Sequence, residues 1–245
     1  MIHKISAVSY LNTLPFIYGM QASGLDNQLD ISLDIPFVCA EKLISGQVDI
    51  GLVPIVVLKQ LRNPQIISDF CIGANGDVDT VCLFSDVPIK EIESIFLDYQ
   101  SQTSSALLKI LLKEYWKISP KLLLSEAGYE EEIQDKQAGL IIGDRAFKYQ
   151  SKFTYTYDLP EIWKLHTGLP FVFATWIANK EIDKYFQNEF NKALSFGVEN
   201  IEKAIDSVSD IYSHCKNPID YLNNKISYKL DENKRKGMEV FLEKI

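Results

Sequence analysis

The chain has 245 residues, of which 47% are hydrophobic and 24% charged, so it has enough apolar material for the core of a globular protein. Its formal net charge of −8 argues against a nucleic-acid-binding surface, which is normally basic, but not against a small anionic ligand held by local donors. No apolar run reaches the roughly 18 residues that a membrane-spanning helix needs, so we expect no membrane span.

The first ten residues, MIHKISAVSY, show no signal-peptide pattern, and we therefore expect a cytoplasmic protein. The four cysteines form no CxxC pair and the histidines are scattered, which predicts buried thiols in a reducing compartment and no metal site. A Walker loop and a GxGxxG turn are both missing, so the sequence also gives no sign of a nucleotide cofactor.

The first eighty residues alternate between β-prone runs and helical patterns. Strands are expected at residues 4–9, 31–37, 48–54 and 65–73, with helices at 39–46 and 55–61. This rhythm predicts a mostly parallel sheet with helices on both faces.

A second segment follows with the same rhythm. Strands are expected at residues 80–84, 94–98, 121–125, 138–144 and 153–159, with the clearest helix at 101–116 and a short acidic helix at 129–137. A long apolar strand at 169–180 comes next, and from Glu181 onward the chain has helical patterns and no strand pattern of its own.

The helical tail must bury its apolar stripes, and it can do so by packing against the unit formed by the first eighty residues. The chain would then cross twice between two lobes, at the TVCLFS segment and at the PFVFATW segment. We therefore predict an α/β clamshell of mixed, mostly parallel sheets, with lobe I made of residues 1–82 and 177–245 and lobe II of residues 83–176. Ligands of open α/β sheets bind beyond the carboxyl ends of the strands, so we expect the site in a cleft between the lobes.

The segment SYLNTLP, residues 9–15, follows the first strand and places polar groups at such a strand end. Asn12 offers donors and an acceptor, while Ser9 and Thr13 offer hydroxyls. A turn or a helix cap would use the same residue types, and composition alone favours that alternative.

Three further strand ends carry candidate groups. Thr103 and Ser104 stand at a helix start, where N–H groups and hydroxyls can bind a carboxylate or a phosphate, or simply cap the helix. Val53 and Pro54 end a buried strand that could face the cleft. Gly143 would let its backbone approach a ligand closely, and Asp144 is either a ligand contact or a helix cap.

Several segments appear together in the order typical of one enzyme family. They are VSYLNTLPF, DIPFVCAEKLISGQVDIGLVPIVVL, TVCLFSDVPI, SQTSSALLKILL, LIIGD and DLPEIWKLHTGLPFVFATW. The chain resembles chorismate dehydratase of the futalosine route to menaquinone over roughly residues 3 to 178. The resemblance implies a periplasmic-binding-protein type II-like fold used as a cytoplasmic carbon–oxygen lyase.

The resemblance also implies roles for particular residues. Asn12 falls on the family's active-site asparagine, and Thr80 falls where many members carry a serine, so both are expected to be catalytic. Thr103 and Ser104 match the hydroxyl pair that holds a substrate carboxylate, while Gln102 stands where an arginine is common. Ser9, Gly143 and Asp144 complete the expected substrate-binding set.

The implied reaction removes water from chorismate, a dianion, to give 3-[(1-carboxyvinyl)oxy]benzoate, without a cofactor or a metal. The substrate's own side-chain carboxylate could serve as the base. Two alternatives remain at this point: the related dihydroxynaphthoate synthase of the same pathway, and a non-catalytic solute-binding protein for a small anion.

Overall fold

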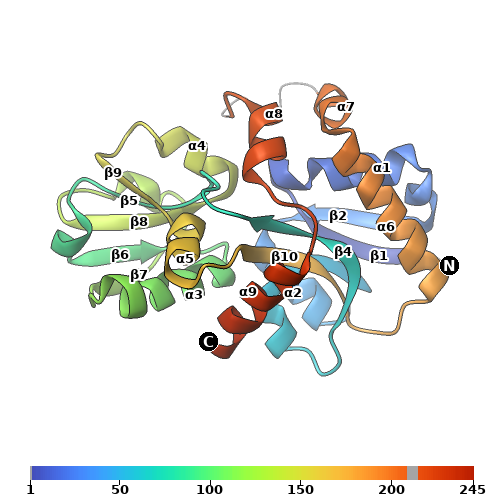
Figure 1. Cartoon of the computed structure of the whole chain (residues 1–245), viewed down its shortest axis with the longest axis horizontal. Helices are drawn as coiled ribbons and strands as arrows, with labels where there is room; N and C mark the ends of the chain where they lie inside the picture. Colours follow the sequence, from blue (N-terminus) through green and yellow to red (C-terminus); the bar gives the residue numbers. More distant parts are fainter. Residues whose placement is uncertain (1, 209–214) are drawn as a thin grey trace.

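The computed structural model describes residues 2–208 and 215–245, and its backbone is built around two five-stranded sheets that lie side by side (Figure 1). The first sheet has the strand order β2-β1-β3-β10-β4. Its strands are β1 (His3–Val8), β2 (Leu29–Asp34), β3 (Ile50–Pro54), β4 (Gln65–Ala74) and β10 (Phe171–Ala178).

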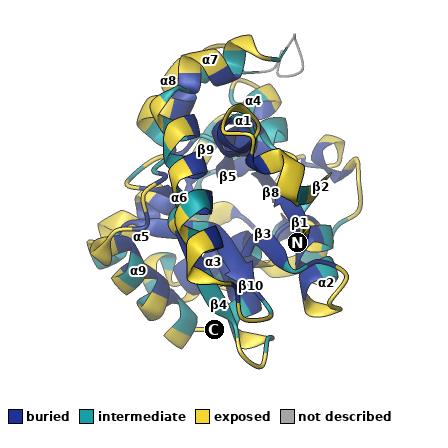
Figure 2. Ribbon diagram, turned by 90° about the vertical axis from the view of Figure 1, so that its right-hand side faces the viewer, coloured by how far each residue is buried: buried dark blue, intermediate teal, exposed yellow. Residues whose placement is uncertain are grey.

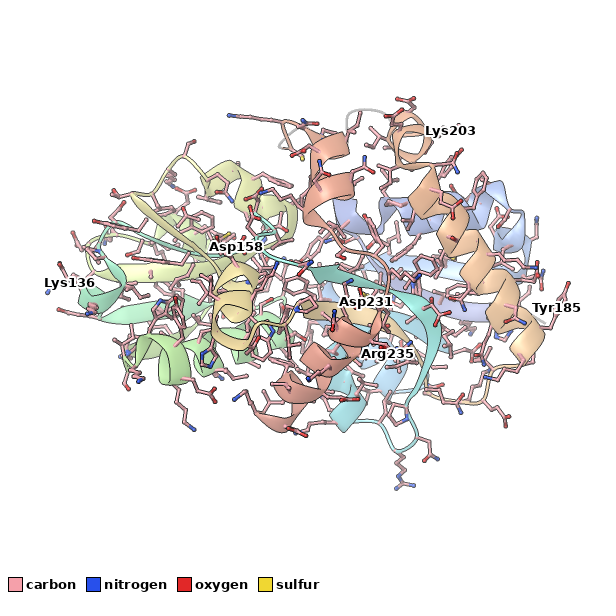
Figure 3. The ribbon with its side chains drawn as sticks, viewed as in Figure 1. Lys136, Asp158, Tyr185, Lys203, Asp231 and Arg235 are labelled. Carbon is pink, nitrogen blue, oxygen red and sulfur yellow. The ribbon has the colours of Figure 1, made fainter. Side chains whose placement is uncertain are left out.

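The second sheet has the order β7-β6-β8-β5-β9 and is made of one continuous part of the chain. Its strands are β5 (Val81–Ser85), β6 (Ser94–Leu97), β7 (Lys121–Leu124), β8 (Gln137–Ile142) and β9 (Tyr155–Asp158). In Figure 3, Lys136 and Tyr185 mark the two far ends of the molecule, and Asp158 lies between them.

Helices cover the two sheets and form the tail. The α-helices are α1 (Leu14–Ala22), α2 (Pro36–Ile44), α3 (Gln102–Leu111), α4 (Ala146–Tyr149), α5 (Leu159–Thr167), α6 (Lys184–Glu199), α7 (Ile201–Asp206), α8 (Pro218–Asp220) and α9 (Glu232–Glu243). Short 3₁₀ turns are η1 (Leu11–Thr13), η2 (Leu25–Gln28), η3 (Ile55–Lys59), η4 (Ile89–Glu91), η6 (Tyr129–Glu131) and η7 (Gly143–Arg145), and η5 (Leu112–Trp116) and η8 (Tyr221–Lys225) are π-helical. Among the residues described, no helix is long and apolar enough to cross a bilayer.

Both sheets are mixed, as expected, but parallel pairs do not predominate. β1 runs parallel to β2 and β3, whereas β10 runs antiparallel to β3 and β4. The second sheet repeats this arrangement, with β6 parallel to β7 and β8, and β5 antiparallel to β8 and β9. In each sheet the antiparallel strand is the one that enters directly from the other sheet.

The chain crosses between the sheets twice, and each crossing precedes a strand. The first lies between the end of β4 at Ala74 and the start of β5 at Val81, and the second lies between α5 and β10. The expected lobe boundaries at 82/83 and 176/177 therefore fall inside β5 and β10. These apolar runs are complete sheet strands, and the connections themselves are the short stretches before them, residues 75–80 and 168–170.

The helical tail returns to the first sheet, as its apolar stripes required. Segment 227–230 runs along β4, with the Cys71 N–H donating to the Tyr228 carbonyl at 2.7 Å and the Leu230 N–H donating to the Asp69 carbonyl at 2.8 Å. α9 lies beside the second crossing, where Phe241 packs edge-to-face on Trp163. Figure 2 shows the buried strands enclosed by helices whose outer faces are exposed. The tail residues 209–214 of the expected lobe I lie outside the described residues.

Some local expectations differ from the structure for identifiable reasons. The strand expected at 31–37 ends at Asp34, because Pro36 begins α2, a position that suits proline at a helix start. The acidic helix expected at 129–137 is only the single turn η6. α1 and α5 were not expected, although each has a proline in its first turn, and Asp158 caps α5 through the Glu161 N–H.

Candidate functional site

A cavity lies where the strand ends of the two sheets meet. Its walls come from the ends of β1, β3 and β8, from the starts of β5 and α3, from β10, and from the tail. The lining residues are Val8, Tyr10, Asn12, Pro36, Pro54, Ile72, Val78, Thr80, Val81, Ser101, Ser104, Ile142, Gly143, Phe173, Ala174 and Ile226. Pro54 is thus at the cavity as expected, whereas Val53 is buried in the core.

The cavity is narrow as it stands. Its volume is about 60 Å³, on a scale where one water molecule needs about 10–15 Å³. A six-membered ring with two carboxylate arms needs more room than a few waters, so the walls must move apart to admit such a ligand.

The wall is apolar with a few neutral polar groups. Asn12, Thr80, Ser101 and Ser104 supply an amide and three hydroxyls, and Tyr10 supplies a phenol. Among the described residues that line the cavity, none is an aspartate, glutamate, histidine, lysine or arginine. An anion bound here would be held by neutral donors and the start of α3, and a proton acceptor would have to come from the ligand.

Asn12 belongs to the turn η1 that directly follows β1, and its side chain is buried. The amide Nδ2 donates to the Tyr221 hydroxyl at 3.4 Å, and the Thr13 hydroxyl donates to Oδ1 at 3.5 Å. The Tyr228 hydroxyl donates to the Asn12 carbonyl at 3.0 Å, so the tail fixes the backbone of this turn.

Thr80 lies in the first crossing, immediately before β5, and is buried. Its Oγ1 is 2.9 Å from the Tyr221 hydroxyl and 3.4 Å from the Val78 carbonyl. The structure therefore brings Asn12 and Thr80, which are far apart in the sequence, to one phenol of the tail.

The start of α3 presents a different hydroxyl pair from the expected one. Ser101 is the N-cap: its Oγ accepts the Ser104 N–H at 3.1 Å and donates to the Ser104 Oγ at 3.0 Å. These two serines line the cavity, because the capping residue and the third residue of the helix share one side. Thr103 does not line it, and its buried Oγ1 has no hydrogen-bond partner among the described residues.

Gly143 and Asp144, at the end of β8, face the segment that follows β1. Gly143 has a φ of +65° and lines the cavity against the ring of Tyr10. Asp144 does not line the cavity. Its carboxylate accepts the Leu11 N–H, at 3.0 Å to Oδ2 and 3.3 Å to Oδ1, so it caps the helix start on the opposite side of the site. Burial raises the pKa of Asp144 to about 6, although this hydrogen bond opposes the shift.

Ser9 is not placed at the cavity. It is exposed, and its N–H continues the parallel ladder by donating to the Asp34 carbonyl at 2.9 Å. Side chains of an extended segment alternate in direction, so Val8 and Tyr10, which flank it, reach the cavity instead.

Sequence reasoning did not single out Tyr10, which lines the cavity just after the end of β1. Its hydroxyl donates to the Gln100 Oε1 on the other side of the cavity, and burial raises its pKa well above the usual range, so it stays protonated. The Gln100 loop is held by Asp98, which accepts the Gln100 N–H at 2.8 Å and pairs with Arg145 at 2.5 Å. The tyrosine of SYLN could have been predicted as a site residue only if it were known which side chains of this segment face the cavity.

Comparison with known proteins gives a family and a fold. The sequence pattern of the family described as menaquinone biosynthesis matches residues 3–245. A chorismate dehydratase of Thermus thermophilus is 29% identical over 190 residues, which are 70% of this chain and 68% of that protein.

Solved structures with the same fold are more distant in sequence. A protein from Archaeoglobus fulgidus has a TM-score of 0.73 at 15% identity, covering 99% of this chain and 96% of that one. A Candida albicans gene product with the generic periplasmic binding protein fold has a TM-score of 0.68 at 12% identity, covering 99% and 89%. The periplasmic aliphatic sulphonate binding protein of Escherichia coli has a TM-score of 0.59 at 14% identity, covering 99% and 87%. The clamshell fold expected from the sequence is thereby confirmed.

Proposed function

The chain belongs to the menaquinone biosynthesis family, and from that premise we propose that it is a chorismate dehydratase, a carbon–oxygen lyase. The related protein of Thermus thermophilus carries this activity in its name. The proposed reaction is the loss of water from chorismate to give 3-[(1-carboxyvinyl)oxy]benzoate.

One observation carries the proposal beyond family membership. The described wall of the cavity offers an amide and hydroxyls but no carboxylate, imidazole or amine. Such a site is poorly equipped for a reaction that needs an enzymic base. It suits a substrate that brings its own base and needs mainly to be held in the right geometry, which can contribute about 7–11 kcal/mol to lowering a barrier.

Chorismate meets these requirements. The hydrogen on C3 and the hydroxyl on C4 lie on the same face of its ring, and the carboxylate of the enolpyruvyl arm is attached through the ether oxygen on C3. This carboxylate takes the C3 proton, the C–H electron pair forms the C3–C4 double bond, and the C4–O bond breaks. The departing hydroxyl receives a proton from the Thr80 hydroxyl and leaves as water, and Thr80 regains a proton from the new carboxylic acid, so no proton is gained or lost overall. The ring becomes aromatic, which supplies the driving force.

The polar groups of the cavity divide into two functions in this proposal. Ser101 and Ser104 at the start of α3 hold the ring carboxylate, which also gains from the helix dipole. Asn12 and Thr80 orient the enolpyruvyl arm and the departing hydroxyl. Thr103 joins the carboxylate site when a ligand is bound, because its buried hydroxyl has an unmet hydrogen bond among the described residues, and leaving one unmet is costly.

We also propose that the protein works as a clamshell. Lobe I is the half built on the first sheet, to which β10 and the tail belong, and lobe II is the half built on the second sheet, with the hinge at the two crossings. Contacts between the lobes close over the cavity, through Tyr10 with Gln100 and Leu11 with Asp144, and would have to break for the ligand to enter. Closure would then exclude water from the reacting ring. The cytoplasmic location expected from the sequence stays a prediction.

The test is to incubate the purified protein with chorismate and to identify the product by mass spectrometry. We expect a loss of 18 mass units, the mass of one water, and an aromatic ultraviolet spectrum. Binding of chorismate without turnover would instead favour a solute-binding protein. If the protein neither binds nor converts chorismate, the proposal is refuted, and the related synthase of the same pathway becomes the candidate function.

A further inference from the structure

Tyr221, in the tail, lies directly behind the two residues proposed to act on the substrate. Its hydroxyl is 2.9 Å from the Thr80 Oγ1 and 3.4 Å from the Asn12 Nδ2. The side chain is buried and is not part of the cavity wall, and its hydroxyl is linked to that wall through these two residues.

The chemistry of the three groups fixes the direction of one hydrogen bond and favours one direction for the other. The Asn12 amide nitrogen can only donate, so the phenol oxygen accepts from it. Burial raises the pKa of Tyr221 far above the working range, so the phenol keeps its proton and can donate it to the Thr80 Oγ1. The hydrogen of the Thr80 hydroxyl is then free to turn from the distant Val78 carbonyl, at 3.4 Å, toward the cavity.

We propose that Tyr221 is a positioning residue for this site: its hydroxyl orients the Asn12 amide and makes the Thr80 hydroxyl a donor toward the cavity. The inference rests on the proposed dehydratase function and deepens it. In that reaction the departing hydroxyl needs a donor, and Tyr221 ensures that Thr80 presents a hydrogen rather than a lone pair.

The surrounding structure holds this phenol firmly. Tyr221 begins the π-helical turn η8, a geometry that is rare and often found at functional sites. Its ring packs edge-to-face on Phe147 of α4, with centroids 5.0 Å apart. At the other end of the turn, Lys225 pairs with Asp77 and, at 3.2 Å, with Asp79 of the first crossing. The tail is thereby tied to this segment at two points, at Thr80 through Tyr221 and at Asp77 and Asp79 through Lys225.

The test is Tyr221→Phe, which removes the hydroxyl and keeps the ring. We expect kcat for chorismate to fall about ten- to a hundredfold, as for a misplaced reacting group, with KM within about twofold. Combining Tyr221→Phe with Thr80→Val should cost less than the product of the two single losses, because both changes remove the same Thr80–Tyr221 hydrogen bond and only the contact with Asn12 is lost in addition. Phe147→Leu, which loosens the ring without touching the hydroxyl, should lower kcat in the same direction by a smaller factor.

The matched control is Tyr149→Phe, which removes the hydroxyl of another buried tyrosine, one that donates to Glu131 at 2.9 Å. It should leave kcat unchanged. A crystal structure of Tyr221→Phe provides a readout that is independent of activity: we expect Thr80 and Asn12 to take new or multiple rotamers. Unchanged rotamers, an unchanged kcat or a change in KM alone would overturn the positioning role. If the wild type does not convert chorismate, the proposed function fails, and the rotamers still decide the role of Tyr221.

Discussion

The ring of Tyr10 occupies the space that a side chain at Gly143 would need. A Cβ placed on Gly143 would lie 2.7–2.9 Å from three atoms of the Tyr10 ring, and the residue has a φ of +65°. Tyr10 follows β1 of the first sheet and Gly143 follows β8 of the second. The two halves of the protein are therefore in direct contact at this point, with no room for a larger side chain between them.

Gly143→Ala should therefore obstruct closure. We expect kcat/KM for chorismate to fall at least tenfold, because the alanine methyl group would hold the two sides apart. Small-angle scattering of the variant with a benzoate product analogue should show a larger radius of gyration than the wild type.

The control for Gly143→Ala is Gly46→Ala. Gly46 follows α2, has a similar φ of +74° and has nothing within 4 Å of its Cβ position. Both variants incur a backbone cost of about 1–2 kcal/mol, and only Gly143→Ala should lose activity. Equal losses of activity in the two variants would mean that backbone strain, rather than the Tyr10 contact, is responsible.

Asn12→Ala should remove activity and leave the fold intact. The loss of an oriented polar group in a closed site commonly costs about 10²–10³ in kcat. Asn191→Ala is the contrasting variant, since Asn191 accepts hydrogen bonds from Ser68 and Asp69 away from the cavity. We expect it to lower the melting temperature and to leave kcat/KM of the folded protein unchanged. Asn12→Ala with more than half of the wild-type kcat/KM would reduce Asn12 to a turn residue.

Thr103→Val should separate stability from binding. The Thr103 hydroxyl is buried with no partner among the described residues, so its removal should raise the free energy of unfolding by about 1 kcal/mol. If the hydroxyl meets a substrate carboxylate, KM should rise while kcat stays close to the wild-type value, since the carboxylate is charged throughout the reaction. Denaturant unfolding and steady-state kinetics measure the two effects.

Ser104→Ala is the companion variant, because Ser104 lines the cavity and is already paired with Ser101. It should raise KM without increasing stability. A gain in stability from Ser104→Ala, or a fall in kcat alone from either variant, would contradict the division of roles at the start of α3.

Asp144 should make stability depend on pH. Burial raises its pKa from 3.8 to about 6, so between these values the folded protein binds a proton more tightly than the unfolded chain does. Its contribution to stability is therefore greatest at low pH and is lost as pH rises from about 4 to about 6. The shift corresponds to at most about 3 kcal/mol.

Asp144→Asn keeps an acceptor for the Leu11 N–H and removes the charge, so it should flatten the stability profile between pH 4 and 6 and stabilise the protein at pH 7. Asp158, whose pKa burial also raises to about 6, stays in both proteins and leaves a residual slope. Asp30→Asn, on the exposed surface of β2, makes the same charge change and should leave the slope as it is. Unfolding by urea across this pH range checks both variants.

The sequence predicted the parts of the fold that depend on local pattern. The strands around Ile50 and Leu140 are uninterrupted apolar runs, and the two-lobe plan followed from a tail that had no sheet of its own. It did not predict that β10 lies inside the first sheet between β3 and β4, because strand order depends on pairing between distant segments.

The candidate site was predicted only in part, because local pattern marks the ends of elements but not the direction of each side chain. Asn12, Thr80, Ser104 and Gly143 all line the cavity, since each stands at the end of a recognisable element. Thr103 does not, because the side of a helix start that faces the cavity depends on which residue is the cap, and here that residue is Ser101. Ser9 does not, because side chains of an extended segment alternate in direction. Tyr221 gave no signal at all: its role depends on a tail that folds back past the first crossing.

The position of β10 between β3 and β4 also affects the order in which the chain can fold. β4 pairs with β10 and with the tail, and β3 keeps one edge unpaired until β10 arrives, whereas the second sheet is made of one continuous segment. The second sheet can therefore form first and bring β10 back to the gap, while the exposed edges of β3 and β4 are vulnerable to aggregation in the meantime. Pulse-labelling hydrogen exchange during refolding should find β6 and β8 protected before β3 and β4. During synthesis, the first sheet is therefore completed after the second, although most of its strands are made first.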